Sequence, residues 1–225
     1  MIKVYTANTP NGLKIPFALE ELGVDYQLVL MNLSEQDQKS REFLEINPNG
    51  RIPAIADYSA PNQEGMPQTV FESGAILLYL AEKYGKLLGR SGADRLAAIE
   101  WLFFQIGGVG PMFGQIGYFR GSDKFPSKNA VARFLEESQR LVSVLDHRLQ
   151  QQTWLAGEHF TIADVANFGW LNYAETAGIE LSSAPAVRAW LRAINSRTAL
   201  KHTRFRFENP DDHFRSGEVL LGVQG

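Results

Sequence analysis

Two stretches decide the fold of this chain: Arg51-Ile52-Pro53-Ala54-Ile55-Ala56 and Val70-Phe71-Glu72-Ser73-Gly74-Ala75-Ile76. The first stretch is typical of a strand that opens on a proline, because proline has no N–H for a sheet ladder and belongs at a strand's first position. A proline between a turn and a strand is also a candidate for a cis bond, and that geometry would turn the Ile52 N–H and C=O outward to pair with an extended peptide. In the second stretch a carboxylate and a hydroxyl stand where an apolar helix begins, and helix N-termini bind anions. A peptide-like ligand with a free carboxylate fits both stretches.

Turn residues and apolar spacing predict the other elements. In the first 85 residues we expect strands and helices in this order: strand 2–5, helix 13–22, strand 26–33, polar or irregular helix 36–46, strand 53–57, strand 68–71 and helix 72–84. The order β-α-β-α-β-β-α is thioredoxin-like, with a parallel start and an antiparallel end. After a linker at 86–93, helical spacing continues over 94–119, 128–152, 162–177 and 184–196. The sequence therefore predicts an α/β domain over 1–85 and an all-α domain over 94–225 with a C-terminal tail.

Two local motifs in the second half have specific structural meaning. The run Gly107-Gly108-Val109-Gly110-Pro111 interrupts a long helix, which predicts a kink or a close approach of the backbone to another group. Thr161 and Asp164 have the spacing of a capping box, with Phe160 and Val165 at the two staple positions. We expect this box to stabilise a helix start, and we assign Asp164 no catalytic role.

Composition limits the functions that are plausible. The 225 residues are 44% hydrophobic and carry a net charge of -3, which gives no reason to expect nucleic acid or an anionic membrane as partner. No apolar run is expected to be long enough to cross a bilayer. The chain has no cysteine, which excludes disulfides, thiolate metal ligands and a protein thiol as nucleophile. This composition fits a cytoplasmic protein. The four histidines lack metal-ligand spacing, so no metal is predicted.

Pro53 after Ile52 and the pair Glu72-Ser73 resemble the glutathione-binding half of a glutathione transferase. Together with residues 5–12, 47–49 and 101–108 and with Phe43, they are similar to the bacterial nu-class transferases and to yeast prion-precursor-like transferases. The resemblance extends over most of the chain. It implies a homodimer that binds one or two glutathione molecules, or glutathione disulfide, in a cleft between the two domains of each subunit.

The resemblance also implies roles for single residues. Thr9 and Asn11 would approach the glutathione sulfur as donors, although both residues could instead only cap the following helix. Ile52 would pair its backbone with the cysteinyl part of the ligand. Glu72 would accept from the γ-glutamyl ammonium, and Ser73 would hold the γ-glutamyl carboxylate.

The resemblance places further residues around this site, and most of them have an alternative role outside it. Gln38 would meet the glycyl end, and Arg51 would add charge there or be a solvated surface residue. Arg133 matches an arginine that reaches across the dimer, or is a surface residue of an amphipathic helix. Tyr5 is a less favoured activator of the thiol, because it lies inside the first strand. A second-substrate pocket would be lined by five residues that could equally belong to the core or the dimer interface: Met112, Phe113, Gln115, Tyr118 and Phe119.

The function predicted from this resemblance is that of a glutathione-dependent disulfide-bond reductase. One glutathione thiolate would attack a small disulfide and a second would resolve the mixed disulfide, because the protein supplies no thiol of its own. The alternatives are a conjugating transferase that acts on small electrophiles and a non-catalytic glutathione-binding module. The role of the tail at 203–225 is left open.

Overall fold

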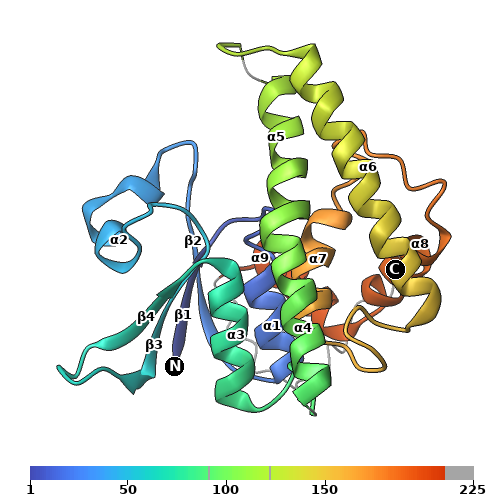
Figure 1. Ribbon diagram of the computed structural model, residues 1–225. Coiled ribbons are helices and arrows are strands. Elements are labelled where there is room, and N and C mark those ends of the chain that lie inside the picture. Colours follow the sequence, from blue (N-terminus) through green and yellow to red (C-terminus); the bar gives the residue numbers. More distant parts are fainter. Residues whose placement is uncertain (91, 122, 211–225) are drawn as a thin grey trace.

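The computed structural model describes residues 1–90, 92–121 and 123–210, and it consists of an α/β part and a helical part that lie side by side (Figure 1). The α/β part contains β1 (Ile2–Thr6), α1 (Lys14–Leu22), β2 (Tyr26–Leu30), the 3-10 helix η1 (Asp37–Lys39), α2 (Arg41–Ile46), β3 (Ala54–Pro61), β4 (Pro67–Phe71) and α3 (Ser73–Tyr84). The helical part contains α4 (Gly92–Phe104), the π-helical segment η2 (Gln105–Val109), α5 (Gly110–Gly121), α6 (Lys128–Gln151), α7 (Ile162–Leu171), α8 (Pro185–Asn195) and α9 (Thr198–Glu208).

The four strands form one sheet in the order β2-β1-β3-β4. β1 and β2 are parallel, whereas β1–β3 and β3–β4 are antiparallel. The thioredoxin-like arrangement predicted from the sequence is therefore confirmed. Strand β3 is longer than predicted and extends to Pro61, so that the hairpin loop to β4 is short.

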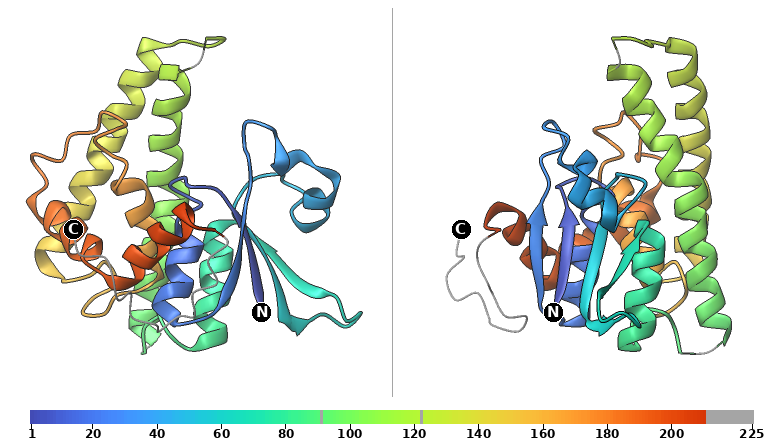
Figure 2. Two further views of the ribbon diagram at one scale, coloured as in Figure 1. Left: turned by 180° about the vertical axis from the view of Figure 1, so that it is seen from behind. Right: turned by 90° about the vertical axis from the view of Figure 1, so that its left-hand side faces the viewer.

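Helices α1 and α3 pack together between the sheet and the helical part, whereas the segment with α2 lies on the opposite side of the sheet (Figures 1 and 2). This placement follows from the apolar side chains of the two helices, which are buried. They include Ile15, Phe17 and Leu19 of α1 and Leu77 and Leu80 of α3. Burial of such side chains contributes about 1.5–3 kcal/mol each. The first domain is thus held against the second by a continuous apolar core.

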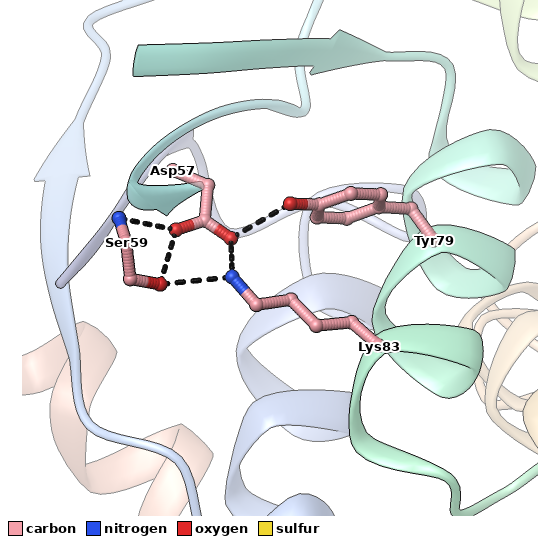
Figure 3. A network of polar contacts seen from close by, with 4 residues as sticks. All are labelled: Asp57, Ser59, Tyr79 and Lys83. Atoms are coloured by element: carbon pink, nitrogen blue, oxygen red, sulfur yellow. Dashed lines mark hydrogen bonds and ion pairs between the residues drawn. The ribbon is translucent and has the colours of Figure 1, made fainter. Parts of the chain in front are cut away.

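A polar network ties β3 to α3 within the first domain (Figure 3). The carboxylate of Asp57 is completely buried and accepts from the ammonium of Lys83 and from the hydroxyl of Tyr79 at 2.9 Å. It also accepts from the N–H and hydroxyl of Ser59 at 2.9 and 2.7 Å. Burial alone would raise the pKa of Asp57, but these four donors outweigh it and lower the pKa to about 2.

The long helix of the second domain continues through its glycine-rich run. Instead of a break, residues Gln105–Val109 form a π-helical segment between α4 and α5. The prediction that no apolar run could cross a bilayer was wrong as to length, since the helical stretch Gly92–Gly121 is long and apolar enough. Here that helix packs against α6 and α7 (Figure 1). Only 33% of its most apolar window is buried, so packing within the described part of one chain covers one face of this helix and leaves other apolar side chains exposed.

The capping box at α7 is confirmed in full. Asp164 accepts from the Thr161 N–H at 2.9 Å, and the Thr161 hydroxyl accepts from the Ala163 N–H at 3.3 Å. Asp164 also accepts from the Leu155 N–H and from the indole of Trp190. Burial raises the pKa of this carboxyl to about 6 despite these bonds.

Two C-terminal predictions needed correction. Helix α7 ends at Leu171 instead of 177, and turns follow it. Helix α9 was not predicted, because its sequence is mostly polar and has little apolar periodicity. It packs against α1 and buries Leu200, Thr203 and Arg206. The tail predicted from 203 thus begins inside a helix, and its residues 211–225 lie outside the described part.

Candidate active site

Strand pairing gathers the predicted site segments at one end of the sheet. Tyr5 of β1 lies opposite Ala54 of β3, so the loop after β1 is close to Pro53. Ala54 also lies opposite Phe71 of β4, which brings the start of α3 to the same end of the sheet. Residues 9–12, 52–53 and 72–73 therefore lie at the same end of the sheet although they are far apart in the sequence.

The segment before β3 exposes backbone polar groups. The Ile52-Pro53 peptide bond is cis, Pro53 is buried and Ile52 is half-buried. No residue in the described ranges hydrogen-bonds the N–H or C=O of Ile52. Backbone groups at a sheet end are a template for an extended peptide. This geometry favours the predicted pairing with a ligand, which stays a prediction.

A buried asparagine holds the turn that precedes Ile52. The Asn47 amide donates to the C=O of Arg51 at 2.6 Å and accepts from the N–H of Asn49 at 3.0 Å. Its side chain thus replaces backbone bonds that the turn cannot make itself. Sequence reasoning used Asn47 only as part of a family pattern and missed this supporting role.

Glu72 and Ser73 form the entrance to α3. Glu72 has φ 68° and ψ 119°, a conformation that costs a non-glycine residue about 1–3 kcal/mol and is concentrated at ligand sites. Its exposed carboxylate accepts from the Asn49 amide at 3.2 Å. Ser73 is the first residue of α3 and is 7% exposed. A carboxylate, a hydroxyl and the free N–H groups of a helix N-terminus are therefore adjacent.

The functional environment of Ser73 includes a residue that sequence reasoning missed. The Lys14 ammonium is buried, donates to Gln105 Oε1 at 2.7 Å and lies 3.3 Å from the Ser73 hydroxyl. Burial lowers the pKa of Lys14 to about 7, and the Glu72 carboxylate opposes this effect. A signal was present in the sequence, because a cation in the first turn of a helix opposes the helix dipole.

The loop that precedes α1 is closely packed. The Thr9 hydroxyl accepts from the Gly12 N–H at 3.0 Å, and the Thr6 hydroxyl donates to the Gly12 C=O at 2.9 Å. A Cβ at position 12 would lie 1.9 Å from the Ala7 carbonyl oxygen, so only glycine fits. The Thr9 hydroxyl thus braces the turn before α1 and does not cap the helix, whose N-cap Leu13 has no side-chain cap bond. The Thr9 hydroxyl hydrogen remains available to another acceptor.

Asn11 contacts the second domain. Its Oδ1 accepts from the indole Nε1 of Trp170 on α7 at 2.9 Å. Gly169, the residue before Trp170, permits this approach, because a Cβ there would lie 2.2 Å from the Pro10 carbonyl oxygen. Sequence reasoning assigned Trp170 no role, since a contact over 159 positions leaves no local signal.

The residues predicted at the glycyl end lie in or near the segment between β2 and β3. Gln38 is on η1, and its side-chain oxygen is buried without a hydrogen-bond partner among the described residues. A Cβ on Gly50 would lie 3.0 Å from the Gln38 carbonyl, so Gln38 is near the turn that leads to Ile52. Arg51 is exposed. A buried oxygen without a donor is a candidate acceptor for a ligand N–H.

Arg133 is separated from these groups within one chain. It lies on α6, its side chain is 65% exposed, and it is 3.9 Å from Glu136 on the same helix. Such an exposed pair contributes little to stability. In the described part of a single chain no contact joins Arg133 to the other predicted site residues.

The five residues predicted to line a second pocket have different environments. Phe113 is completely buried and packs edge-on against Trp170, so it belongs to the core and not to an open wall. Met112 is half-buried, Gln115 and Tyr118 are exposed, and Phe119 stacks on Phe134. The helical period of α5 explains these different environments, because one face of that helix packs on α6 and α7 while the other faces away from them.

The less favoured activator Tyr5 lies within β1, where its ring packs on Phe43 at 5.8 Å. Burial, with a contribution from Tyr58, raises the pKa of Tyr5. The Tyr5 ring therefore packs against a buried aromatic residue within the α/β part. Among residues 1–90, 92–121 and 123–210, no group of three or more His, Asp or Glu is arranged to hold a metal.

Comparison with known proteins gives a consistent result. Residues 1–82 match the family described as "Glutathione S-transferase, N-terminal domain", and residues 109–198 match "Glutathione S-transferase, C-terminal domain". The disulfide-bond oxidoreductase YfcG of Escherichia coli is 46% identical over 199 residues, which are 88% of this chain and 92% of that protein.

Two solved structures have the same architecture. A glutathione transferase from Burkholderia graminis, with two glutathione molecules bound per subunit, is 39% identical with a TM-score of 0.82 over 90% of this chain and 86% of that chain. One from Pseudomonas putida, with one glutathione disulfide bound per subunit, has the same identity and TM-score over 90% of both chains.

Proposed function

Because the chain belongs to the glutathione S-transferase family, we propose that it is a glutathione-dependent disulfide-bond reductase. The observation that carries this proposal is one end of the sheet where the unbonded backbone groups of Ile52 and the N-terminus of α3 lie together, in a chain with no cysteine. Both reacting thiols must then come from the ligand. The similar proteins support the proposal, since one is named for disulfide-bond oxidoreduction and others hold two glutathiones or the disulfide.

The proposed binding mode assigns each part of glutathione to a different group at this end of the sheet. The cysteinyl backbone pairs with the open N–H and C=O of Ile52. The γ-glutamyl ammonium binds the exposed Glu72 carboxylate, and the γ-glutamyl carboxylate binds Ser73 and the N-terminus of α3. Gln38 and Arg51 face the glycyl end, where a ligand N–H would satisfy the buried oxygen of Gln38.

The proposed reaction consists of two thiol–disulfide exchanges. The first glutathione thiolate attacks one sulfur of a small disulfide, which forms a mixed disulfide and releases one thiolate. The second glutathione thiolate then attacks the glutathione sulfur of the mixed disulfide, which yields glutathione disulfide and the second thiol. Thr9 and Asn11 promote both steps by donating hydrogen bonds to the thiolate, because the thiolate and not the thiol is the nucleophile.

We further propose that the protein works as a homodimer in the cytoplasm. Leu96 and Phe103 of α4 are 57% and 65% exposed, and their spacing of seven places them on one helix face. A second copy that covers this apolar face would also allow Arg133 to reach the partner's ligand. Light scattering tests the dimer, and a monomer at micromolar concentration would contradict it.

Paired turnover assays test the activity. We expect reduction of a small disulfide at the expense of glutathione to be much faster than conjugation of an aryl halide. The opposite preference would identify a conjugating transferase that uses the same glutathione site. Calorimetry that detects binding of glutathione without either reaction would favour a non-catalytic module, and no binding at all would refute the proposal.

Substitution of the proposed thiolate donor gives a residue-level test. Asn11→Ala is expected to lower disulfide turnover more than about tenfold, because it removes a hydrogen-bond donor to the glutathione thiolate. The measurement is kcat/KM for the disulfide at saturating glutathione. An unchanged value would remove Asn11 from the mechanism.

A further inference from the structure

The hydrogen bond between Trp170 and Asn11 has a chemical direction. An indole N–H can only donate, whereas an amide side chain has one accepting end and one donating end. The 2.9 Å contact therefore requires Asn11 Oδ1 to face Trp170 and turns Nδ2 away from it. No acceptor among the described residues binds that amino group, so it is free to donate to another molecule.

Trp170 is itself held in place by the glycines of α5. A Cβ on Gly110 would lie 3.2 Å from the indole nitrogen, and a Cβ on Gly114 would lie 3.3 Å from the ring. Phe113 packs edge-on against the same ring at 6.4 Å. The glycine-rich run thus makes room for the indole and defines its position.

On this basis, and resting on the proposed function, we infer that Trp170 is a positioning residue that directs the Asn11 amino group at the glutathione sulfur. The loop that carries Asn11 follows β1 at the end of the sheet where β3 begins after Pro53, and the cysteinyl part is proposed to bind there. If the amide were rotated by half a turn, its carbonyl oxygen would face the thiolate and repel it. A donor-only partner on α7 prevents that rotation, so the second domain controls a donor in the first.

The first test is Trp170→Phe, which removes the N–H and keeps an aromatic ring. We expect the pKa of the bound glutathione thiol, followed by ultraviolet absorbance of the thiolate, to rise by about one unit, and disulfide turnover at neutral pH to fall about tenfold. Glutathione affinity should change little. The matched control is Trp101→Phe, which removes an indole from α4 outside the site.

A double-mutant cycle separates positioning from a general structural effect. In an Asn11→Ala background, Trp170→Phe should have almost no further effect on the thiol pKa, because the group that it orients is absent. An equal effect in both backgrounds would overturn the inference. An unchanged thiol pKa in the single variant would overturn it as well.

Asn11→Asp provides a second test that does not depend on repacking the tryptophan. A carboxylate still accepts from the indole but presents an oxygen instead of an amino group to the sulfur. We expect this variant to bind glutathione and to raise the thiol pKa above that of the wild type. An unchanged thiol pKa would refute the inference, whereas failure of the wild-type protein to bind glutathione would instead refute the proposed function.

Discussion

Lys14 and Asp57 are two buried charged groups of the same domain whose surroundings are opposite. Asp57 has a cationic partner, Lys83, and three further donors, and the pKa of its carboxyl is lowered to about 2 despite burial (Figure 3). Lys14 contacts a neutral amide and a hydroxyl, and burial lowers its pKa to about 7. The first charge is compensated within the fold. The second lies at the entrance to α3, where a ligand carboxylate would compensate it.

The largest expected effect comes from removing the partner of Asp57. Lys83→Met leaves a buried carboxylate without its counter-ion, which should lower the free energy of unfolding by about 3 kcal/mol or more. Urea unfolding at neutral pH measures this loss. The double variant Asp57→Asn, Lys83→Met is the control and should lose less than the single variant. A loss under about 1 kcal/mol would mean that the pair behaves like an exposed one.

Lys14 should give the protein a stability that increases with pH. The unfolded lysine keeps its proton up to about pH 10, whereas the folded one loses it near pH 7, so the unfolded state binds more protons between these values. We expect the free energy of unfolding to rise by about 2 kcal/mol from about pH 7 to about pH 9 relative to Lys14→Met. If the free energies of unfolding of the wild type and of Lys14→Met changed in parallel with pH, the pKa of Lys14 would not be lowered in the folded protein.

Asp57 should also make the free energy of unfolding increase with pH, but in the acid range. Its folded pKa is below that of an unfolded aspartate, so its contribution is complete above about pH 4 and is lost as the pH falls toward 2. The loss relative to Asp57→Asn is expected to be about 1–2 kcal/mol. Acid titration followed by circular dichroism measures it, and identical acid midpoints would contradict the network's role.

The smallest expected effect tests whether a ligand completes the surroundings of Lys14. S-methylglutathione has both carboxylates but no ionisable thiol. Its binding at about pH 8 should raise the pKa of Lys14 and take up a fraction of a proton. Calorimetry in buffers of different ionisation enthalpy measures the uptake, and Lys14→Met is the control. Binding with no uptake would show that the carboxylate does not interact with Lys14.

Local patterns predicted most of the fold. Turn residues around Pro53 and apolar spacing in the helices were enough for the order of strands and helices, and the capping box at Thr161 was found as expected. The predicted domain boundaries, with the first domain ending at residue 85 and the second beginning at residue 94, stay predictions. Helix α9 was not predicted, because its buried face includes the polar residues Thr203 and Arg206. Only its packing on α1 makes it part of the core.

The sequence by itself determined that the chain has no cysteine, and it predicted two parts, a strand that opens on a proline and a helix that opens on a carboxylate and a hydroxyl, because these features depend on residue types at neighbouring positions. Only the tertiary structure decided the partners of Lys14 and the direction of the Asn11 amide. The partners of Lys14 are 59 and 91 positions away and the partner of Asn11 is 159 positions away, and contacts at such separations have no periodicity to reveal them. The desolvation of an ammonium and the orientation of an amide arise only when two domains pack together.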